Sequence, residues 1–190
     1  MLFRSVGMEA ILRGFVEALA GEGIVIERLF FPLKVLHPQA NIAGYRLEDG
    51  AYREVQVLHS DRFQAMLRQS PFWPIFAGEA RIRRRLQDLQ ADEFPTYHEL
   101  AQGGFQDYLM LGVDFANGDR NAISFATRMD GGFREDQLQT IEMALPALVL
   151  LVEREHAKVI ATTVTQVYLG AETGPKVLAG RVYRGDVERR

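Results

Sequence analysis

Residues 107–129, "DYLMLGVDFANGDRNAISFATRM", decide the fold, because two apolar runs in them flank a tight-turn signal. The signal is Asn117-Gly118, a dipeptide that favours the positive φ angles of short hairpin loops. Residues 41–59 repeat this arrangement with Asp49-Gly50 in the middle. The sequence therefore predicts two antiparallel hairpins, which form the framework of a sheet.

Helices and further strands are predicted around the hairpins. Apolar residues recur at helical spacing in residues 5–21, and glycines end that segment. Residues 24–38 are rich in β-branched and aromatic residues and indicate a strand, in which Pro32 favours an edge or a bulge. Residues 79–88 fit either a strand or a helix. The order of elements indicates an α+β fold, an antiparallel sheet flanked by helices, and it leaves the strand order open.

The composition is that of an ordinary globular chain. It has 190 residues, 47% of them hydrophobic, and a formal net charge of -3, so we expect no general attraction to nucleic acid or to anionic membranes. It contains no cysteine, which excludes disulfides and cysteine-based zinc sites. Glu9 and Glu17 interrupt the first apolar pattern, which does not resemble a signal peptide, and the longest apolar run, residues 143–152, is too short to span a bilayer. We expect a cytoplasmic protein.

The helix predicted over residues 134–170 is longer than a domain of this size needs, since about 1.5 Å per residue gives roughly 50 Å. An apolar stripe with alternating spacings of three and four runs from Leu138 to Leu169 and is interrupted at Glu155. We expect the first half to pack on the sheet and the second half to form a parallel two-helix contact in a homodimer. A helix folded wholly on its own domain is the alternative. The residues assigned to signal transmission are Leu148, Val152, Val159, Tyr168, Leu169 and Gly170.

Several stretches together resemble the regulatory part of a known enzyme family. Residues 107–153 are similar to the last hairpin and exit helix of GAF-type sensory domains. Residues 28–47, "RLFFPLKVLHPQANIAGYRL", and residues 82–86, "IRRRL", resemble segments found with it upstream of bacterial class III adenylate cyclase domains. Residues 167–186, "VYLGAETGPKVLAGRVYRGD", look like the connector that enters such a cyclase domain, although Val187 stands where the family pattern has glycine.

The resemblance implies a GAF-like sensory domain over residues 1–152, a helical transmitter over 153–170 and a connector over 171–190. It implies a regulatory and dimerisation module of an adenylate cyclase, whose magnesium or manganese and catalytic residues would belong to a domain after the connector. The family's two metal-binding aspartates are not among these residues, so we assign no catalytic residue, metal or cofactor to this chain and expect it to be no enzyme by itself. The alternative is a ligand-free dimeric scaffold with a vestigial GAF fold.

Aromatic residues gather in the middle of the chain, where sensory domains of this layout hold a small-molecule effector between sheet and helices. For each residue taken singly, a place in the ordinary core is the alternative. The residues predicted to line this pocket are Phe63, Trp73, Phe76, Tyr97, His98 and Tyr108.

The histidines and the run of arginines are more typical of structural residues than of a metal site or an anion site. None of the four histidines shows metal-ligand spacing, although His59 and His98 could meet in the fold and bind a metal or haem iron. The basic run over residues 81–85 could grip an anionic ligand or a partner's acidic patch, but a solvated face balanced by nearby carboxylates is the more ordinary arrangement. The carboxylates that could balance it are Asp88, Asp92 and Glu93.

Overall fold

The computed structural model describes residues 6–37, 40–58 and 61–181. Its elements follow the order that the sequence predicts, and residues 81–85 of the ambiguous segment form a strand. The elements are α1 (Val6–Gly21), β1 (Arg28–His37), β2 (Ala40–Glu48), β3 (Ala51–Leu58), α2 (Asp61–Arg68), α3 (Phe72–Phe76), β4 (Arg81–Arg85), α4 (Pro95–Gln102), β5 (Asp107–Asp114), β6 (Arg120–Thr127) and α5 (Glu135–Leu178).

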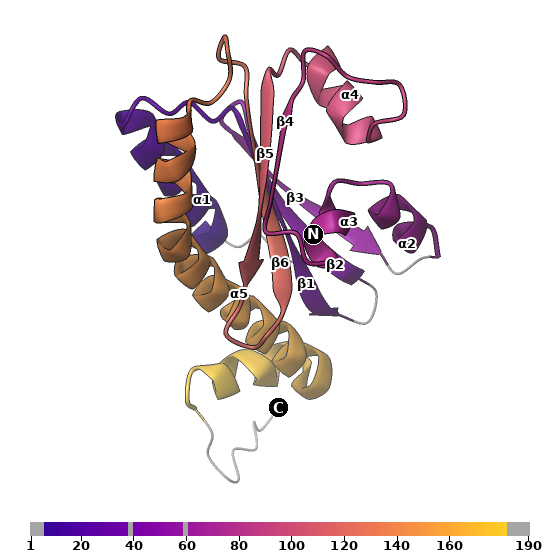
Figure 1. Ribbon diagram of the computed structural model, residues 1–190. Helices are drawn as coiled ribbons and strands as arrows, with labels where there is room; N and C mark the ends of the chain where they lie inside the picture. The colour runs from indigo at the N-terminus through magenta and orange to yellow at the C-terminus, as the bar shows by residue number, and fades with distance from the viewer. Residues whose placement is uncertain (1–5, 38–39, 59–60, 182–190) are drawn as a thin grey trace.

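The six strands form one antiparallel sheet in the order β3-β2-β1-β6-β5-β4. The pairing of β1 with β6 joins the two predicted hairpins at the centre of the sheet. Helices α1 and α5 cover one face of the sheet, and α2, α3 and α4 lie over the other (Figure 1). The α+β prediction is confirmed, and the strand order supplies the topology that it left open.

Both predicted hairpin turns are present, but their geometries differ. Asp49 and Gly50 have φ angles of 49° and 73°, the two positive values of a type I′ turn. In the loop 115–119, all of which the structure describes, Gly118 alone is left-handed, with φ 83°. Its amide donates to the carbonyl of Phe115, and the amide of Phe115 donates to the carbonyl of Asp119. This longer loop leaves Asn117 outside the left-handed region.

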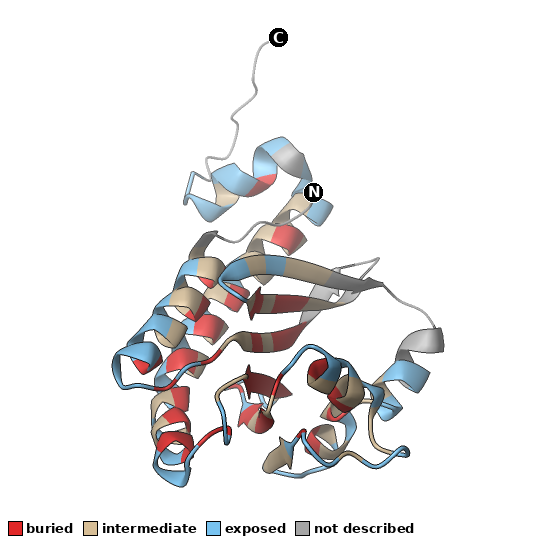
Figure 2. Ribbon diagram, turned by 90° about the horizontal axis from the view of Figure 1, so that it is seen from above, coloured by how far each residue is buried: buried red, intermediate tan, exposed pale blue. Residues whose placement is uncertain are grey.

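Alternate strand residues enter two different environments, because successive side chains of a strand point to opposite faces. Toward α1 and α5 the side chains are large and apolar, and Leu29, Phe31, Leu33, Ile123 and Phe125 are each at most 1% exposed. Figure 2 shows the buried residues of both helices turned toward the sheet. The helices add Met8, Leu12, Leu138, Ile141, Leu148 and Val152 to this core.

The opposite face of the sheet carries a smaller buried cluster under α3 and α4. It contains Ile75 of α3, Tyr97 and Leu100 of α4, and Tyr108 and Met110 of β5. Small residues of β6, Ala122 and Ala126, also belong to it. The sheet therefore has one fully packed face and one face that is only partly filled.

Pro32 occupies a stretch of β1 where a missing amide is tolerated. Within the described residues β1 pairs with β6 over Arg28–Phe30, whereas its pairing with β2 continues past Pro32, which lies opposite Gly44. The strand is central in the sheet but has a free edge at this point. The edge context predicted from the proline is therefore confirmed locally.

Helix α5 breaks at Gly170 (φ 83°, ψ 163°), which is where the predicted long helix ends. Helical structure resumes after Gly170 and extends to Leu178, so the first part of the predicted connector is helical. Pro175 lies close to the start of the resumed segment, so its ring removes one hydrogen bond there and not in an established helix interior.

The resumed segment turns back on the end of the long helix. Gly174 is buried, and a Cβ added to it would lie 3.0 Å from the carbonyl oxygen of Thr165. Gly180 (φ 73°) ends the segment, and the amides of Gly180 and Arg181 donate to the carbonyls of Val177 and Lys176, as in a Schellman motif. The rest of the predicted connector, residues 182–190, lies outside the described residues.

Candidate functional site

A cavity of about 370 Å³ lies between the sheet and helices α2, α3 and α4. This volume falls within the range of small-molecule sites. Strands β1, β2, β3, β5 and β6 form its floor, and the helices and the residues beside them form its roof. Among the lining residues are Arg28, Phe30, Arg46, Tyr108 and Ser124 from the floor and Met66, Phe72, Phe76, Thr96 and Glu99 from the roof.

Small residues on the floor leave this space open. Ser124 lines the cavity, while its chain neighbours Ile123 and Phe125 point into the opposite core. A Cβ at Gly44 would lie 2.6 Å from the ring of Phe30, so glycine is needed for that ring to lie over β2. The Phe30 ring then meets Phe72 of α3 edge-on, with the ring centroids 5.8 Å apart.

Two arginines line the cavity from neighbouring strands. Arg28 of β1 lies opposite Glu48, and Arg46 of β2 lies opposite Phe30, so the two arginines are diagonal neighbours on one face. Their guanidinium carbons lie 5.9 and 5.3 Å from the centre of the Phe30 ring, within cation–π range. A Glu48 oxygen lies 3.2 Å from Nε of Arg28 and 3.9 Å from Nη1 of Arg46. One carboxylate is thus shared by two cations.

The Arg46 side chain is incompletely satisfied. Its Nε is buried and has no hydrogen-bond partner among the described residues. Burial lowers the pKa of the Arg46 guanidinium, and repulsion from Arg28 lowers it further. Arginine nevertheless remains charged at neutral pH. Because a buried donor without an acceptor is costly, this nitrogen marks a place where a ligand acceptor could bind.

Tyr108 places a second buried polar atom at the cavity. Its hydroxyl has no partner of regular hydrogen-bond geometry among the described residues, although the Ser124 side chain lies near enough to affect its ionisation. Burial raises the pKa of Tyr108, so the hydroxyl stays protonated at neutral pH and can donate.

The predicted pocket residues divide into three groups. Phe76 and Tyr108 line the cavity. Tyr97 is buried behind the wall with its ring 5.4 Å from Tyr108, and burial raises its pKa to about 12. Trp73 is 39% exposed and lies under the guanidinium of Arg68.

His98 and Phe63 complete that prediction. His98 is partly buried and its Nε2 has no hydrogen-bond partner among the described residues, but it is not among the cavity-lining residues. The side chain of Phe63 lies outside the described residues, as does His59. The sequence interpretation missed Arg28 and Arg46, and their alternation with apolar residues in strand segments was the signal that could have found them.

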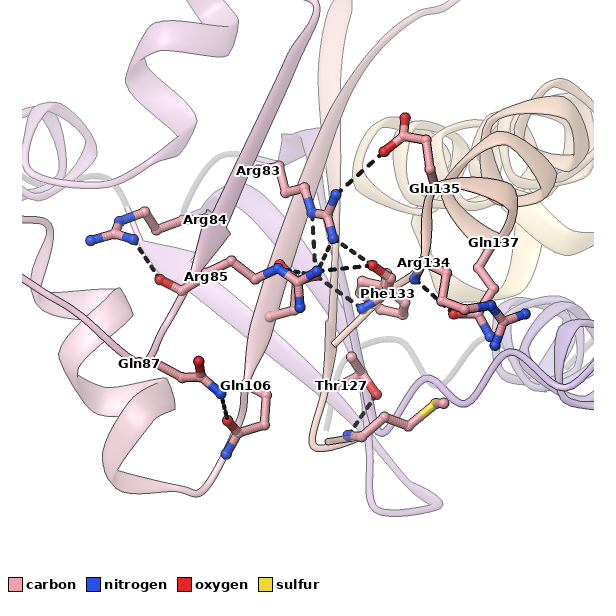
Figure 3. A network of polar contacts seen from close by, with 12 residues as sticks. Arg83, Arg84, Arg85, Gln87, Gln106, Thr127, Phe133, Arg134, Glu135 and Gln137 are labelled. Carbon is pink, nitrogen blue, oxygen red and sulfur yellow. Dashed lines mark hydrogen bonds and ion pairs between the residues drawn. The ribbon is translucent and has the colours of Figure 1, made fainter. Parts of the chain in front are cut away.

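The basic run ties the edge of the sheet to the start of α5 (Figure 3). Asp107 of β5 is fully buried and accepts hydrogen bonds from Arg83 at 2.9 Å and from the amide of Phe133 at 3.0 Å. Nη1 of Arg83 also lies 3.5 Å from Glu135 in the first turn of α5. Gly132 has φ 63°, and a Cβ there would collide with Asp107, so glycine is required before Phe133.

Arg84 points to the other side of β4, away from α5. It pairs with Glu93 at 2.6 Å, and this hydrogen-bonded pair lowers the pKa of Glu93 to about 2. Of the carboxylates expected to balance the run, Glu93 does so, while Asp88 accepts from Arg84 through its backbone carbonyl. The other balancing charges come from Asp107 and from α5, which lie far away in the sequence.

The residues assigned to signal transmission occupy three environments along α5. Leu148 and Val152 are buried in the core against the sheet, Val159 is half-buried, and Gly170 breaks the helix. Tyr168 and Leu169 are 81% and 45% exposed. The first half of the predicted stripe therefore packs on its own sheet, as expected.

Glu155 interrupts the predicted stripe for a structural reason. Its carboxylate lies against Gly7 in the first turn of α1, where the helix dipole favours negative charge. The same glycine leaves room for it, since a Cβ would collide with the carboxylate.

A second stripe on α5 faces away from the domain core. Met143 is 74% exposed and Leu150 is 69% exposed. Small and apolar residues continue from them at alternating spacings of four and three, with Arg154 as the charged exception. The stripe consists of Met143, Ala147, Leu150, Arg154, Ala157, Ala161, Val164 and Tyr168.

Within the described residues, no group of three or more histidine or acidic side chains could hold a metal ion. No helix in that part of the chain is both long enough and apolar enough to cross a membrane.

Comparison with solved structures gives the fold its place among known proteins. The chain superposes on the GAF domain of a two-component sensor histidine kinase from Bacillus halodurans with a TM-score of 0.52, 19% sequence identity, and coverage of 78% of this chain and 92% of that one. The chain has a GAF-like fold. A phycoerythrobilin-bound GAF domain from a cyanobacterial phytochrome is also similar, with a TM-score of 0.47, 12% identity, and coverage of 81% and 89%. Neither a protein-family model nor a curated protein sequence matches the chain.

Proposed function

We propose that this GAF-like chain is the sensory and dimerisation module of a class III adenylate cyclase, and that it controls cyclic AMP synthesis by a catalytic domain that follows the connector. The observation that carries this proposal is the stretch "VYLGAETGPKVLAGRVYRGD", residues 167–186, at the end of a helix that extends beyond its own core. The setting in this proposal is cytoplasmic, and the catalytic residues would belong to the domain that follows the connector.

The cavity under α2, α3 and α4 supports a sensory role over a ligand-free scaffold. A scaffold gains stability by filling its interior, whereas this face keeps about 370 Å³. Within the described residues, Nε of Arg46 has no hydrogen-bond partner there, and the hydroxyl of Tyr108 has only the Ser124 side chain nearby. A bound effector would satisfy both groups and stabilise one arrangement of the floor and roof.

Strand β5 provides a route from the cavity to the output helix. Tyr108 lines the cavity, and its neighbour Asp107 holds the amide of Phe133 immediately before α5. Arg83 joins the same carboxylate to Glu135 in the first turn of the helix. A ligand that shifts Tyr108 would therefore act on the start of α5 through one peptide unit and one buried carboxylate.

The exposed stripe of α5, from Met143 to Tyr168, is the dimer contact in this proposal. Its spacing of four and three is that of a two-helix seam, and its alanines and Arg154 make the seam only marginally stable. Marginal stability suits a transmitter, because an effector of ordinary affinity can shift only a shallow equilibrium.

Light scattering on this chain at tens of micromolar tests the dimer. We expect a dimer for the unmodified chain and a monomer for Leu150→Glu, which puts a charge in the centre of the stripe. Val25→Glu is the matched control, since Val25 is also exposed, at 41%, but lies outside α5. A monomeric unmodified chain, or a Leu150→Glu chain that stays dimeric, would rule out this contact.

Cyclic AMP formation by the full-length protein tests the cyclase assignment. We expect synthesis from ATP with magnesium or manganese, and none from this chain alone. Tyr168→Ala or Leu169→Ala should change basal activity at least about twofold with the sensory fold intact, because both residues lie where the long helix meets the break at Gly170. Full-length protein without cyclase activity would refute the assignment, and unchanged activity and effector response in both variants would make this stretch a passive tether.

A further inference from the structure

We propose that the cavity binds a small organic anion, with one carboxylate or phosphate group held by Arg28, Arg46 and Tyr108 and a compact apolar body packed against Phe30 and Phe72. The proposal rests on the proposed sensory function in one respect, that this cavity is the effector site. It adds the chemical class of the effector.

The polar groups that would hold the anion converge from adjacent strands. One row across the sheet carries Arg46, Phe30 and Ser124, since Phe30 pairs with Arg46 on one side and with Ser124 on the other. The next row carries Arg28 and, beyond Ala126, Tyr108. Both rows lie on the face that lines the cavity, so the two guanidinium groups and the tyrosine hydroxyl border one space.

Two of these groups are buried donors available to a ligand. Nε of Arg46 has no hydrogen-bond partner among the described residues, and the hydroxyl of Tyr108 has only the Ser124 side chain nearby, without regular hydrogen-bond geometry. An anionic oxygen is the acceptor that would satisfy an arginine most strongly, because charge-assisted hydrogen bonds are about twice as strong as neutral ones. A neutral apolar ligand would leave both donors unpaired, and a cation would be repelled.

The charged side chains of the cavity lining are also mainly positive. Among the described residues they are Arg28 and Arg46, with Glu99 as the one carboxylate. Glu48, outside the lining, is shared between the two arginines. A negative group on a ligand would add a partner for both guanidinium groups without displacing that shared carboxylate.

The rest of the cavity lining indicates what kind of molecule the anionic group belongs to. The walls are apolar at Pro32, Ile42, Val55, Leu67 and Phe76. Inorganic phosphate would leave these walls without a partner. A space of about 370 Å³ that combines apolar walls with one charged end suits a compact amphipathic acid.

Two dyes with one ring skeleton provide the test. 1-Anilinonaphthalene-8-sulfonate carries an anionic group, and N-phenyl-1-naphthylamine lacks it. We expect fluorescence titration of the unmodified chain to give at least about tenfold tighter binding of the sulfonate dye. Arg46→Gln should weaken the sulfonate dye about tenfold and leave the neutral dye within about twofold. Arg53→Gln, which removes the same charge from an exposed residue opposite Arg46, is the matched control and should change neither dye by more than about twofold.

Blocking variants locate the dyes in the cavity. Ser124→Leu fills the floor and Val55→Phe fills the side near β3, so each should abolish binding of both dyes, with near-ultraviolet circular dichroism confirming that at least one variant is folded. Displacement of the sulfonate dye by octanoate or octyl phosphate, but not by 1-octanol, then identifies the preferred head group.

The outcomes separate the two proposals. Equal affinity for both dyes, with both blocked by Ser124→Leu or Val55→Phe, would overturn the anion assignment and keep a ligand-binding cavity. A sulfonate dye unaffected by Arg46→Gln, or displaced equally by 1-octanol, would also overturn the assignment. Dye binding that neither folded blocking variant reduces, or no dye binding to the unmodified chain, would overturn both the anion assignment and the use of this cavity as an effector site.

Discussion

The two faces of the sheet are built from the same strands, but one is a packed apolar core and the other borders a cavity. Toward α1 and α5, Phe31 and Phe125 are completely buried in a continuous apolar core. One residue away along the same strands, Phe30 and Ser124 line a cavity that also contains two arginines. The alternation of side chains allows one face to stabilise the fold while the other stays available for binding.

This division places the main apolar core and the cavity in separate layers. The packed face holds most of the buried apolar area, so the cavity face can carry unpaired donors without loss of the fold. One connection between the faces runs through Asp107, where the sheet meets the start of α5. A change on the cavity face should therefore cost less global stability than a change on the packed face, except at that junction.

Phe31→Ala and Phe30→Ala compare the two faces on a single strand. Phe31 is completely buried, and truncating such a residue costs about 3–5 kcal/mol of unfolding free energy, because the surroundings fill the void only partly. Phe30 borders a space that already exists, so we expect its truncation to cost roughly 1–2 kcal/mol, as for partial loss of buried area. Urea unfolding of both variants measures the difference, and equal costs would mean that the cavity face supports the fold as much as the packed face.

Asp107→Ala tests the junction between the faces. The variant removes the acceptor of Arg83 and of the Phe133 amide, and we expect a loss of about 2–3 kcal/mol, somewhat less than for a fully buried ion pair because Arg83 is partly exposed. Amide hydrogen exchange should show the loss concentrated in the first turns of α5. Asp114→Ala is the matched control on the same strand, since Asp114 pairs with Arg120 at the exposed end of β5. Uniform loss of protection across the sheet in Asp107→Ala would contradict a local junction.

The sequence predicts the order of elements well, because period and turn chemistry are local properties. Asp49-Gly50 identifies its turn through backbone conformation alone, and the stripe from Leu138 identifies the core face of α5. Strand order was left open, since the pairing of β1 with β6 joins segments about a hundred residues apart. The sequence does not predict the helical segment after Gly170. A proline is tolerated near the start of a helix but not in its interior, and the sequence does not reveal that a new helix starts after Gly170.

The candidate site was predicted in location but not in chemistry. Aromatic content identified Phe76 and Tyr108, yet the same criterion also selected Trp73, which is 39% exposed. Arg28 and Arg46 share one face only through the register of β1 with β2, so their proximity follows from strand pairing. The partners of the basic run also depend on the structure. Because successive side chains of β4 point to opposite faces, Arg83 pairs with Asp107 near α5, and Arg84 pairs with Glu93 in the loop before α4.

The pair of Arg84 and Glu93 gives the smallest expected effect and a pH-dependent comparison of the faces. The hydrogen bond from Arg84 lowers the pKa of Glu93 from 4.5 to about 2, so the pair stabilises the folded state fully above about pH 4.5, and this contribution is lost as the pH falls toward 2. The effect should be small because the pair is exposed to solvent. We expect the difference in unfolding free energy between the unmodified chain and Glu93→Gln to shrink between pH 5 and pH 3. In Arg84→Gln, the Glu93→Gln change should give almost no such pH dependence, and a carboxyl chemical-shift titration should return the pKa of Glu93 toward its usual value. Because this pair ties β4 to the cavity side alone, protection of the first turn of α5 should stay unchanged in both variants. Loss of that protection would mean that the two faces are coupled along the whole of β4 and not only through Asp107.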